Sequence, residues 1–208
     1  VGLVTVLQVE YFKVLVPEGR LYIGPHTTLG ALLTTPLQVV IEGNLLNMGR
    51  LVDTAVEMEV TGHVQNNGTI THRLMLVHGN LTNSGDWVAP TKLTGNHART
   101  LLAKPPIRGN VELLTPVWLT GDATGVTFEG ILNTNNHPIT MDPGSRLTLK
   151  GPELASSILL GSESGDPLLV IDRSISTIAL KADLTLQAST VVIRGGTRVV
   201  ASSVPRVL

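Results

Sequence analysis

The chain has 208 residues, of which 42% are hydrophobic but only 3% aromatic, so its core must be built from Val, Leu, Ile and Ala. A net charge of -1 with 15% charged residues leaves no basic stripe for a phosphate backbone, and we expect no nucleic acid partner. No apolar run approaches the roughly 18 residues of a membrane span, and the lack of cysteine excludes disulfides and thiolate metal sites.

The chain opens with a hydrophobic stretch, VGLVTVLQVEYFKVLV, at positions 1–16. We expect residues 1–20 to form an N-terminal cap or a first coil that pairs with a neighbour. The chain starts at Val1 without a charged segment before an apolar signal stretch, which indicates a processed chain or a piece of something longer.

A repeat follows, in three segments that align on Gly43, Gly62 and Gly79. The segments are IEGNLLNMGRL, VTGHVQNNGTI and VHGNLTNSGDW. Apolar residues lie two and four positions before each glycine and two after it, which is the period-two alternation of strands with one buried face. These apolar columns are Val39, Met58 and Met75; Ile41, Val60 and Val77; and Leu45, Val64 and Leu81.

Asparagine and glycine form two further columns of the repeat. They contain Asn47, Asn66 and Asn83, and Gly49, Gly68 and Gly85. Both residue types tolerate left-handed backbone geometry, so we expect a corner there, with the stacked asparagines hydrogen-bonded along the stacking axis as a ladder. A fourth, imperfect copy follows at Phe128, Gly130 and Leu132, with Thr134 in the asparagine column.

Residues 88–119 are less regular and contain Pro90, Pro105, Pro106 and Pro116. Because proline removes a donor from a strand ladder, we expect an irregular loop region there that departs from the repeat. Alternation returns over residues 146–151, 168–172, 177–189 and 190–196, which we expect to be further strands. Residues 153–162 are the best candidate for a helix, and that helix would have only a couple of turns.

A unit of about 17–19 residues matches one coil of a solenoid with short strands joined by corners, and it is too short for a helix pair or a propeller blade. The sequence therefore predicts a single all-β domain over residues 1–208, a parallel β-solenoid (β-helix) with Asn/Gly corners. About eleven coils, stacked about 4.8 Å apart, would make a rod of about 50 Å. A β-sandwich is the alternative, although the aligned columns argue against its antiparallel hairpins.

The pattern GNLLNMG, GHVQNNG and GNLTNSG resembles the short repeats in β-helical passenger regions of bacterial secreted adhesins, such as filamentous haemagglutinins and autotransporters. More loosely, it resembles the strand-rich G8 type of extracellular module. The resemblance covers residues 39–88 and brings no catalytic motif with it. It implies a β-helical fold and an extracellular or cell-surface location.

Candidate catalytic and metal-binding residues do not converge in the pattern. Parallel β-helices can host polysaccharide lyases and hydrolases that use outward carboxylates, and the candidates here are Glu42, Glu57, Glu59 and Glu129. Their spacing requires no shared site, so we expect solvated outward side chains and no catalytic residue. The histidines of the repeat region, His63, His72 and His78, fall in different columns, so we expect no metal site and no cofactor.

These patterns predict a non-catalytic, extracellular structural or adhesive β-solenoid, with assembly end to end into filaments as a specific form. The expected partners are copies of the chain itself, end to end or side by side, or surface glycans. Two alternatives stay open. A polysaccharide lyase or hydrolase would need carboxylates of adjacent coils within about 10 Å of each other. A carbohydrate-binding module would need exposed aromatic residues on a flat strip, and Trp87 occupies an apolar column that favours the core.

Overall fold

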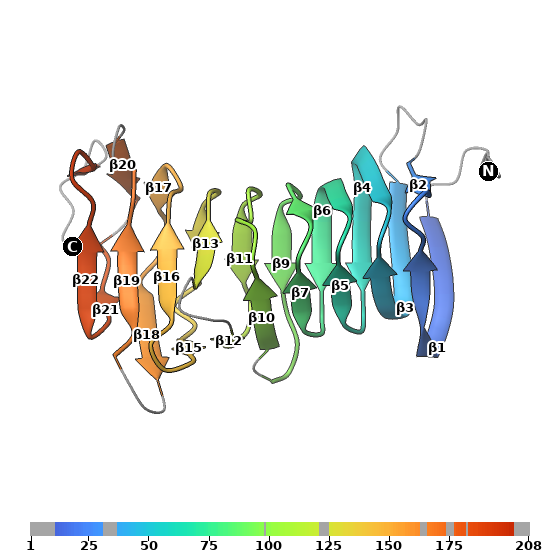
Figure 1. The fold of residues 1–208 in the computed structure, drawn as a ribbon, viewed down its shortest axis with the longest axis horizontal. Coiled ribbons are helices and arrows are strands. Elements are labelled where there is room, and N and C mark those ends of the chain that lie inside the picture. Colours follow the sequence, from blue (N-terminus) through green and yellow to red (C-terminus); the bar gives the residue numbers. More distant parts are fainter. Residues whose placement is uncertain are drawn as a thin grey trace.

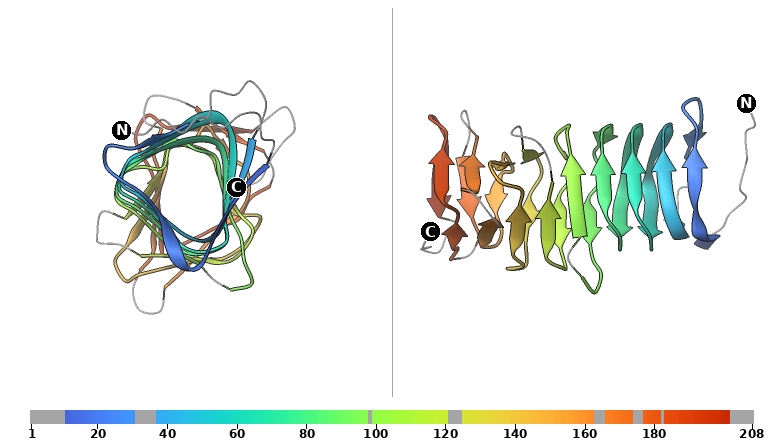
Figure 2. Two further views of the ribbon diagram at one scale, coloured as in Figure 1. Left: turned by 90° about the vertical axis from the view of Figure 1, so that its right-hand side faces the viewer. Right: turned by 60° about the horizontal axis from the view of Figure 1, so that its bottom comes forward.

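The computed structural model describes residues 11–30, 37–97, 99–120, 125–162, 166–173, 177–181 and 183–201. These residues form strands and turns without any helix, and every strand pairing among them is parallel. Figure 1 shows the coils stacked from one end of a rod to the other, and the end-on view in Figure 2 shows them winding around a common axis. The prediction of a parallel β-solenoid is confirmed, and the β-sandwich alternative is wrong because it requires antiparallel pairs.

The strands form three faces along the rod, and four long strands bend around a corner to serve two faces each. These long strands are β1 (Tyr11–Ile23), β3 (Leu37–Asn47), β4 (Arg50–Val60) and β6 (Thr69–Val77). Face A contains the first part of β1 and β3, the last part of β4 and β6, then β9 (Thr91–Leu93), β11 (Val111–Leu113) and β14 (Leu132–Asn133).

Face B starts with the last part of β1 and β3. It continues through β5 (Val64–Asn66), β7 (Leu81–Asn83), β10 (Arg99–Ala103), β12 (Val117–Leu119), β15 (Ile139–Met141), β18 (Ile158–Ser162) and β21 (Leu186–Gln187).

Face C starts with β2 (Thr28–Leu29) and the first part of β4 and β6. It continues through β8 (Asp86–Trp87), the single bridge residue Ile107, β13 (Val126–Phe128), β16 (Arg146–Leu149), β19 (Leu168–Ile171) and β22 (Thr190–Ile193). A separate sheet contains β17 (Glu153–Leu154), β20 (Thr177–Leu180) and β23 (Arg198–Ala201).

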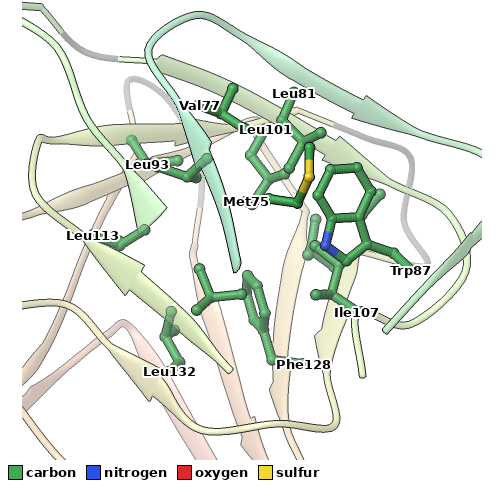
Figure 3. Packing of buried hydrophobic residues seen from close by; sticks show 14 of the residues in the cluster. Met75, Val77, Leu81, Trp87, Leu93, Leu101, Ile107, Leu113, Phe128 and Leu132 are labelled. Carbon is green, nitrogen blue, oxygen red and sulfur yellow. The ribbon is translucent and has the colours of Figure 1, made fainter. Parts of the chain in front are cut away.

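The core is a set of inward columns, each built from one residue per coil. The face C column contains Leu51, Ile70, Trp87, Ile107, Phe128, Leu149 and Ile171, all buried. Figure 3 shows the aromatic members of this column, Trp87 and Phe128, packed among aliphatic side chains of the cluster. Burying one such side chain stabilises the fold by about 1.5–3 kcal/mol relative to leaving it exposed. Trp87 is fully buried, so the sequence prediction of a core position is confirmed.

The coils become longer toward the C-terminal end. Along the face C column, Ile70 stacks on Trp87 in an early coil, whereas Leu149 stacks on Ile171 in a late one, across a longer stretch of chain. The described residues form about eight turns, whereas eleven were expected for the whole chain from the coil length of the first repeats. The added residues lengthen the corners, so the strands keep their register while the sequence loses a fixed period.

The expectation of an irregular loop at residues 88–119 was wrong, because the described residues of this region continue the coils. They contain β9, β10, β11 and β12, each in register with the neighbouring coils. Two of the four prolines, Pro90 and Pro116, lie directly before strands, where the ladder uses their carbonyl groups: Pro90 accepts from the Met75 N–H at 2.8 Å and Pro116 from the Arg99 N–H at 3.0 Å. A missing N–H therefore interrupts nothing at these two positions.

Two further expectations change. Residues 153–162, the helix candidate, form β17 and β18, because Leu154, Ile158 and Leu160 alternate into the core. The fourth repeat copy lies on a different corner from the first three: Phe128 belongs to face C and Leu132 to face A, whereas the earlier copies pass from face A to face B. Of the expected N-terminal cap, residues 1–10 lie outside the described residues and residues 11–20 belong to β1.

Candidate functional site

The predicted asparagine column is a buried ladder at the end of face B. The side-chain Nδ2 of Asn47 donates to Oδ1 of Asn66 at 2.7 Å, and Nδ2 of Asn66 donates to Oδ1 of Asn83 at 2.7 Å. All three side chains are 0% exposed. A buried amide is costly unless it is hydrogen-bonded, and here the asparagine of each coil supplies a hydrogen-bond partner to the asparagine of the next coil. The ladder ends at Ala103, which pairs with Asn83.

The glycine column has a steric cause. A Cβ at Gly68 would overlap the carbonyl oxygen of Gly49, and a Cβ at Gly85 would overlap that of Gly68. None of the predicted corner asparagines and glycines has a positive φ, which among the described residues occurs elsewhere, for example at Asn135 (48°) and Asn136 (62°). The expectation of left-handed corners was therefore wrong. Inward-pointing amides and close backbone approach account for these columns.

A second polar column lies at the corner between faces A and B, and the sequence analysis did not identify it. It contains Asn44, His63 and Asn80, directly after the first glycine of each repeat, and we call it the corner column. Oδ1 of Asn44 accepts from the His63 N–H at 2.7 Å, and Nδ1 of His63 accepts from the Asn80 N–H at 2.9 Å. Oδ1 of Asn80 accepts from the Thr100 N–H at 3.0 Å. Each side chain thus satisfies the backbone of the following coil.

The four candidate glutamates each pair with a basic side chain of an adjacent coil. The pairs are Glu42 with Lys13, Glu57 with Arg73 (3.4 Å), Glu59 with His78 (2.9 Å), and Glu129 with Lys150 (3.9 Å). Glu42 lies on β3, and Glu57 and Glu59 lie on the neighbouring strand β4, whereas Glu129 follows β13 several coils further along the rod. Each of these four glutamates contacts a different basic side chain.

The three histidines of the repeat region have separate surroundings. His63 belongs to the corner column, His78 contacts Glu59, and the buried His72 contacts the Asp53 carbonyl through Nδ1 at 3.0 Å. Burial lowers the pKa of His72 despite that hydrogen bond, because the charged imidazolium is poorly solvated there. Within the described ranges, no three His, Asp or Glu side chains come together in a way that could hold a metal ion.

A hollow of about 280 Å³ opens on the outside of face B, across β1, β3, β5 and β7. It is lined by Arg20, Asn44, Leu45, Leu46, His63, Val64, Gln65, Asn80 and Thr82. The register between β1 and β3 shifts between Val16 and Arg20, so β1 departs from the regular ladder at this corner. Such irregularities commonly accompany binding sites in sheets. The described residues of the lining supply amides, an imidazole and one guanidinium, and none of them carries a carboxylate.

Fold and side-chain arrangement together define the chain as a parallel β-solenoid with a buried asparagine ladder and a polar hollow on one face. No known protein family, curated protein or solved structure matches the chain. None of the described residues belongs to a helix that could cross a membrane. The contacts between coils and two exposed features, the hollow and the last described coil, are the parts of the molecule that bear on its function.

Proposed function

We propose that the chain is a structural rod, an extracellular or cell-surface β-solenoid that supplies rigidity and associates end to end. The main support is that seven ion pairs and one histidine–carboxylate contact among the described residues all join neighbouring coils. They are Lys13–Glu42, Glu57–Arg73, Glu59–His78, Asp86–Arg108, Lys92–Glu112, Glu129–Lys150, Glu153–Lys181 and Asp172–Arg194. Each such surface pair contributes little on its own, because solvent and salt screen exposed charges. Together with the buried ladder, they favour one register between coils.

The extracellular location is supported by the resemblance of residues 39–88 to repeats of secreted bacterial adhesins. A structural function is further supported by the use of polar side chains within the stack. Charged groups that could take part in catalysis, such as Glu57 and Glu59, contact basic side chains of adjacent coils. No contact in the described part of the chain favours a polysaccharide lyase or hydrolase over the rod.

End-to-end association is supported by the last coil. Val191 and Ile193 in β22 are 40% and 45% exposed, whereas their partners one coil earlier, Leu169 and Ile171, are 0% exposed. These two side chains occupy core columns that no further described coil covers. A further coil would cover them, and we propose that a second copy supplies it, since an open strand edge is a template for pairing. Head-to-tail contacts of this kind do not close, so they produce filaments.

The test compares the wild-type chain with a double variant, Val191→Lys and Ile193→Lys, and with Thr190→Lys as a control on the same exposed strand. Analytical ultracentrifugation and negative-stain electron microscopy measure association and particle length. We expect the wild type and the control to form rods longer than one chain as concentration increases, and the double variant to remain single. A wild type that stays single at every concentration would exclude end-to-end association.

A further inference from the structure

The hollow on face B has an unusual balance of hydrogen-bonding groups. Asn44 and Asn80 both use Oδ1 to accept a backbone N–H of the next coil, and His63 uses Nδ1 in the same way. The acceptor atoms of the corner column are thus occupied within the fold. Asn44 also donates from Nδ2 to the Gly19 carbonyl at 3.1 Å. The donors left on this column are therefore Nδ2 of Asn80 and Nε2 of His63, because a neutral imidazole that accepts at Nδ1 carries its proton on Nε2.

Arg20 adds a positive charge to these donors. Among the described residues that line the hollow it alone carries a permanent charge, and it makes no ion pair with the described part of the chain. This distinguishes Arg20 from the basic side chains that join neighbouring coils elsewhere on the rod. A guanidinium presents paired donors that match the geometry of a carboxylate or sulfate group.

An apolar surface lies beside the donors. Tyr22 is 55% exposed and pairs in register with Leu46, which lines the hollow. Aromatic rings with a polar tip are suited to contacts with ligands that have both an apolar face and hydroxyl groups. A sugar ring has this combination, and an acidic sugar also carries the oxyanion that the donors and Arg20 would accept.

We propose that the hollow binds the oxyanion of an acidic saccharide, a carboxylate or a sulfate group, with Arg20 and His63 as the main contacts and Tyr22 against the sugar ring. The proposal goes beyond the structural rod, because it adds a surface-glycan ligand of a named chemical class. It does not depend on end-to-end association, since face B is exposed along the side of the rod.

The test measures binding of polygalacturonate, dextran sulfate and neutral dextran to the full chain by calorimetry. The first variant, Arg20→Gln, removes the charge. The second, His63→Asn, keeps a side-chain acceptor of the kind that Asn44 and Asn80 provide, but removes the imidazole. Arg50→Gln is the matched control, because Arg50 is exposed on face C and loses the same charge.

We expect at least one acidic polymer to bind and neutral dextran to bind at least about tenfold more weakly, since neutral dextran offers no oxyanion to Arg20 and the donors. Arg20→Gln should weaken binding about tenfold or more and Arg50→Gln should not. Polygalacturonate and dextran sulfate separate carboxylate from sulfate as the preferred group. Equal binding of neutral dextran, equal loss in the two arginine variants, or no binding of either acidic polymer would overturn the proposal. Ultracentrifugation of the same samples shows separately whether rods associate.

Discussion

Asn66 is the middle member of the buried asparagine ladder, and its replacement by alanine tests what holds the coils in register. The change removes two side-chain hydrogen bonds of 2.7 Å, to Asn47 and Asn83, and a weaker one from the Gly68 N–H. Nδ2 of Asn47 keeps a second partner, the carbonyl of Thr69 at 3.1 Å. Oδ1 of Asn83 and the Gly68 N–H lose their hydrogen-bond partner. The buried Oδ1 of Asn83 costs about 1–3 kcal/mol without a partner and the half-buried Gly68 N–H costs less, so we expect a loss of about 2–4 kcal/mol.

Urea unfolding followed by circular dichroism measures this loss as a change in midpoint at constant slope. The control is Asn67→Ala, which changes the adjacent exposed residue and should alter the free energy of unfolding by less than about 0.5 kcal/mol. Asn83→Ala should fall between the two, because Asn83 lies at the end of the ladder beside Ala103. An Asn66→Ala variant within about 1 kcal/mol of Asn67→Ala would refute the argument that the ladder is a major source of stability.

Two further changes test the close stacking and the buried imidazole. Gly68→Ala should cost about 1–3 kcal/mol in urea unfolding, because the new Cβ overlaps the Gly49 carbonyl, whereas Gly161→Ala, with open space around it, should be close to neutral. Burial lowers the pKa of His72 below its usual value near 6.5. The free energy of unfolding is therefore unaffected by His72 above about pH 6.5, and it decreases as the pH falls from there toward the folded-state pKa, because the unfolded chain binds the proton first. The free energy of unfolding should fall by at most about 1.4 kcal/mol per pH unit in that range, and the fall should be smaller in His72→Asn; equal slopes would contradict it.

The sequence predicted the fold where coils have nearly constant length. Over residues 39–88 the apolar and asparagine columns recur at nearly the same interval, so their alignment by sequence matches the alignment of strands in space. Beyond Trp87, every coil along the face C column is longer than the coil from Ile70 to Trp87, as far as Ile193. A search for a fixed period fails there although the parallel pairing continues, because corners absorb extra residues that strands cannot.

Local rules about residue types were misleading at two places for a common reason. Proline was expected to end the strand ladder, but Pro90 and Pro116 occupy positions where only the carbonyl takes part. The copy around Gly130 has the right spacing, yet Gly130 stacks on Gly109 rather than on the glycine of an earlier copy. In both places the position within the coil decides the outcome, and a single coil of sequence does not specify that position.

The corner column shows what kind of signal sequence comparison can miss. Asn44, His63 and Asn80 differ in residue type, so the column lacks the identity that made the asparagine ladder visible. They share one property, an acceptor atom placed to take the backbone N–H of the next coil. Asn110 does the same for Ile131 on another corner. Comparing repeats by hydrogen-bonding capacity would therefore have found this column. It would also have indicated that donors of His63 and Asn80 are left for a ligand, whereas Asn44 donates to the Gly19 carbonyl, and these two donors are part of the basis of the proposed oxyanion site.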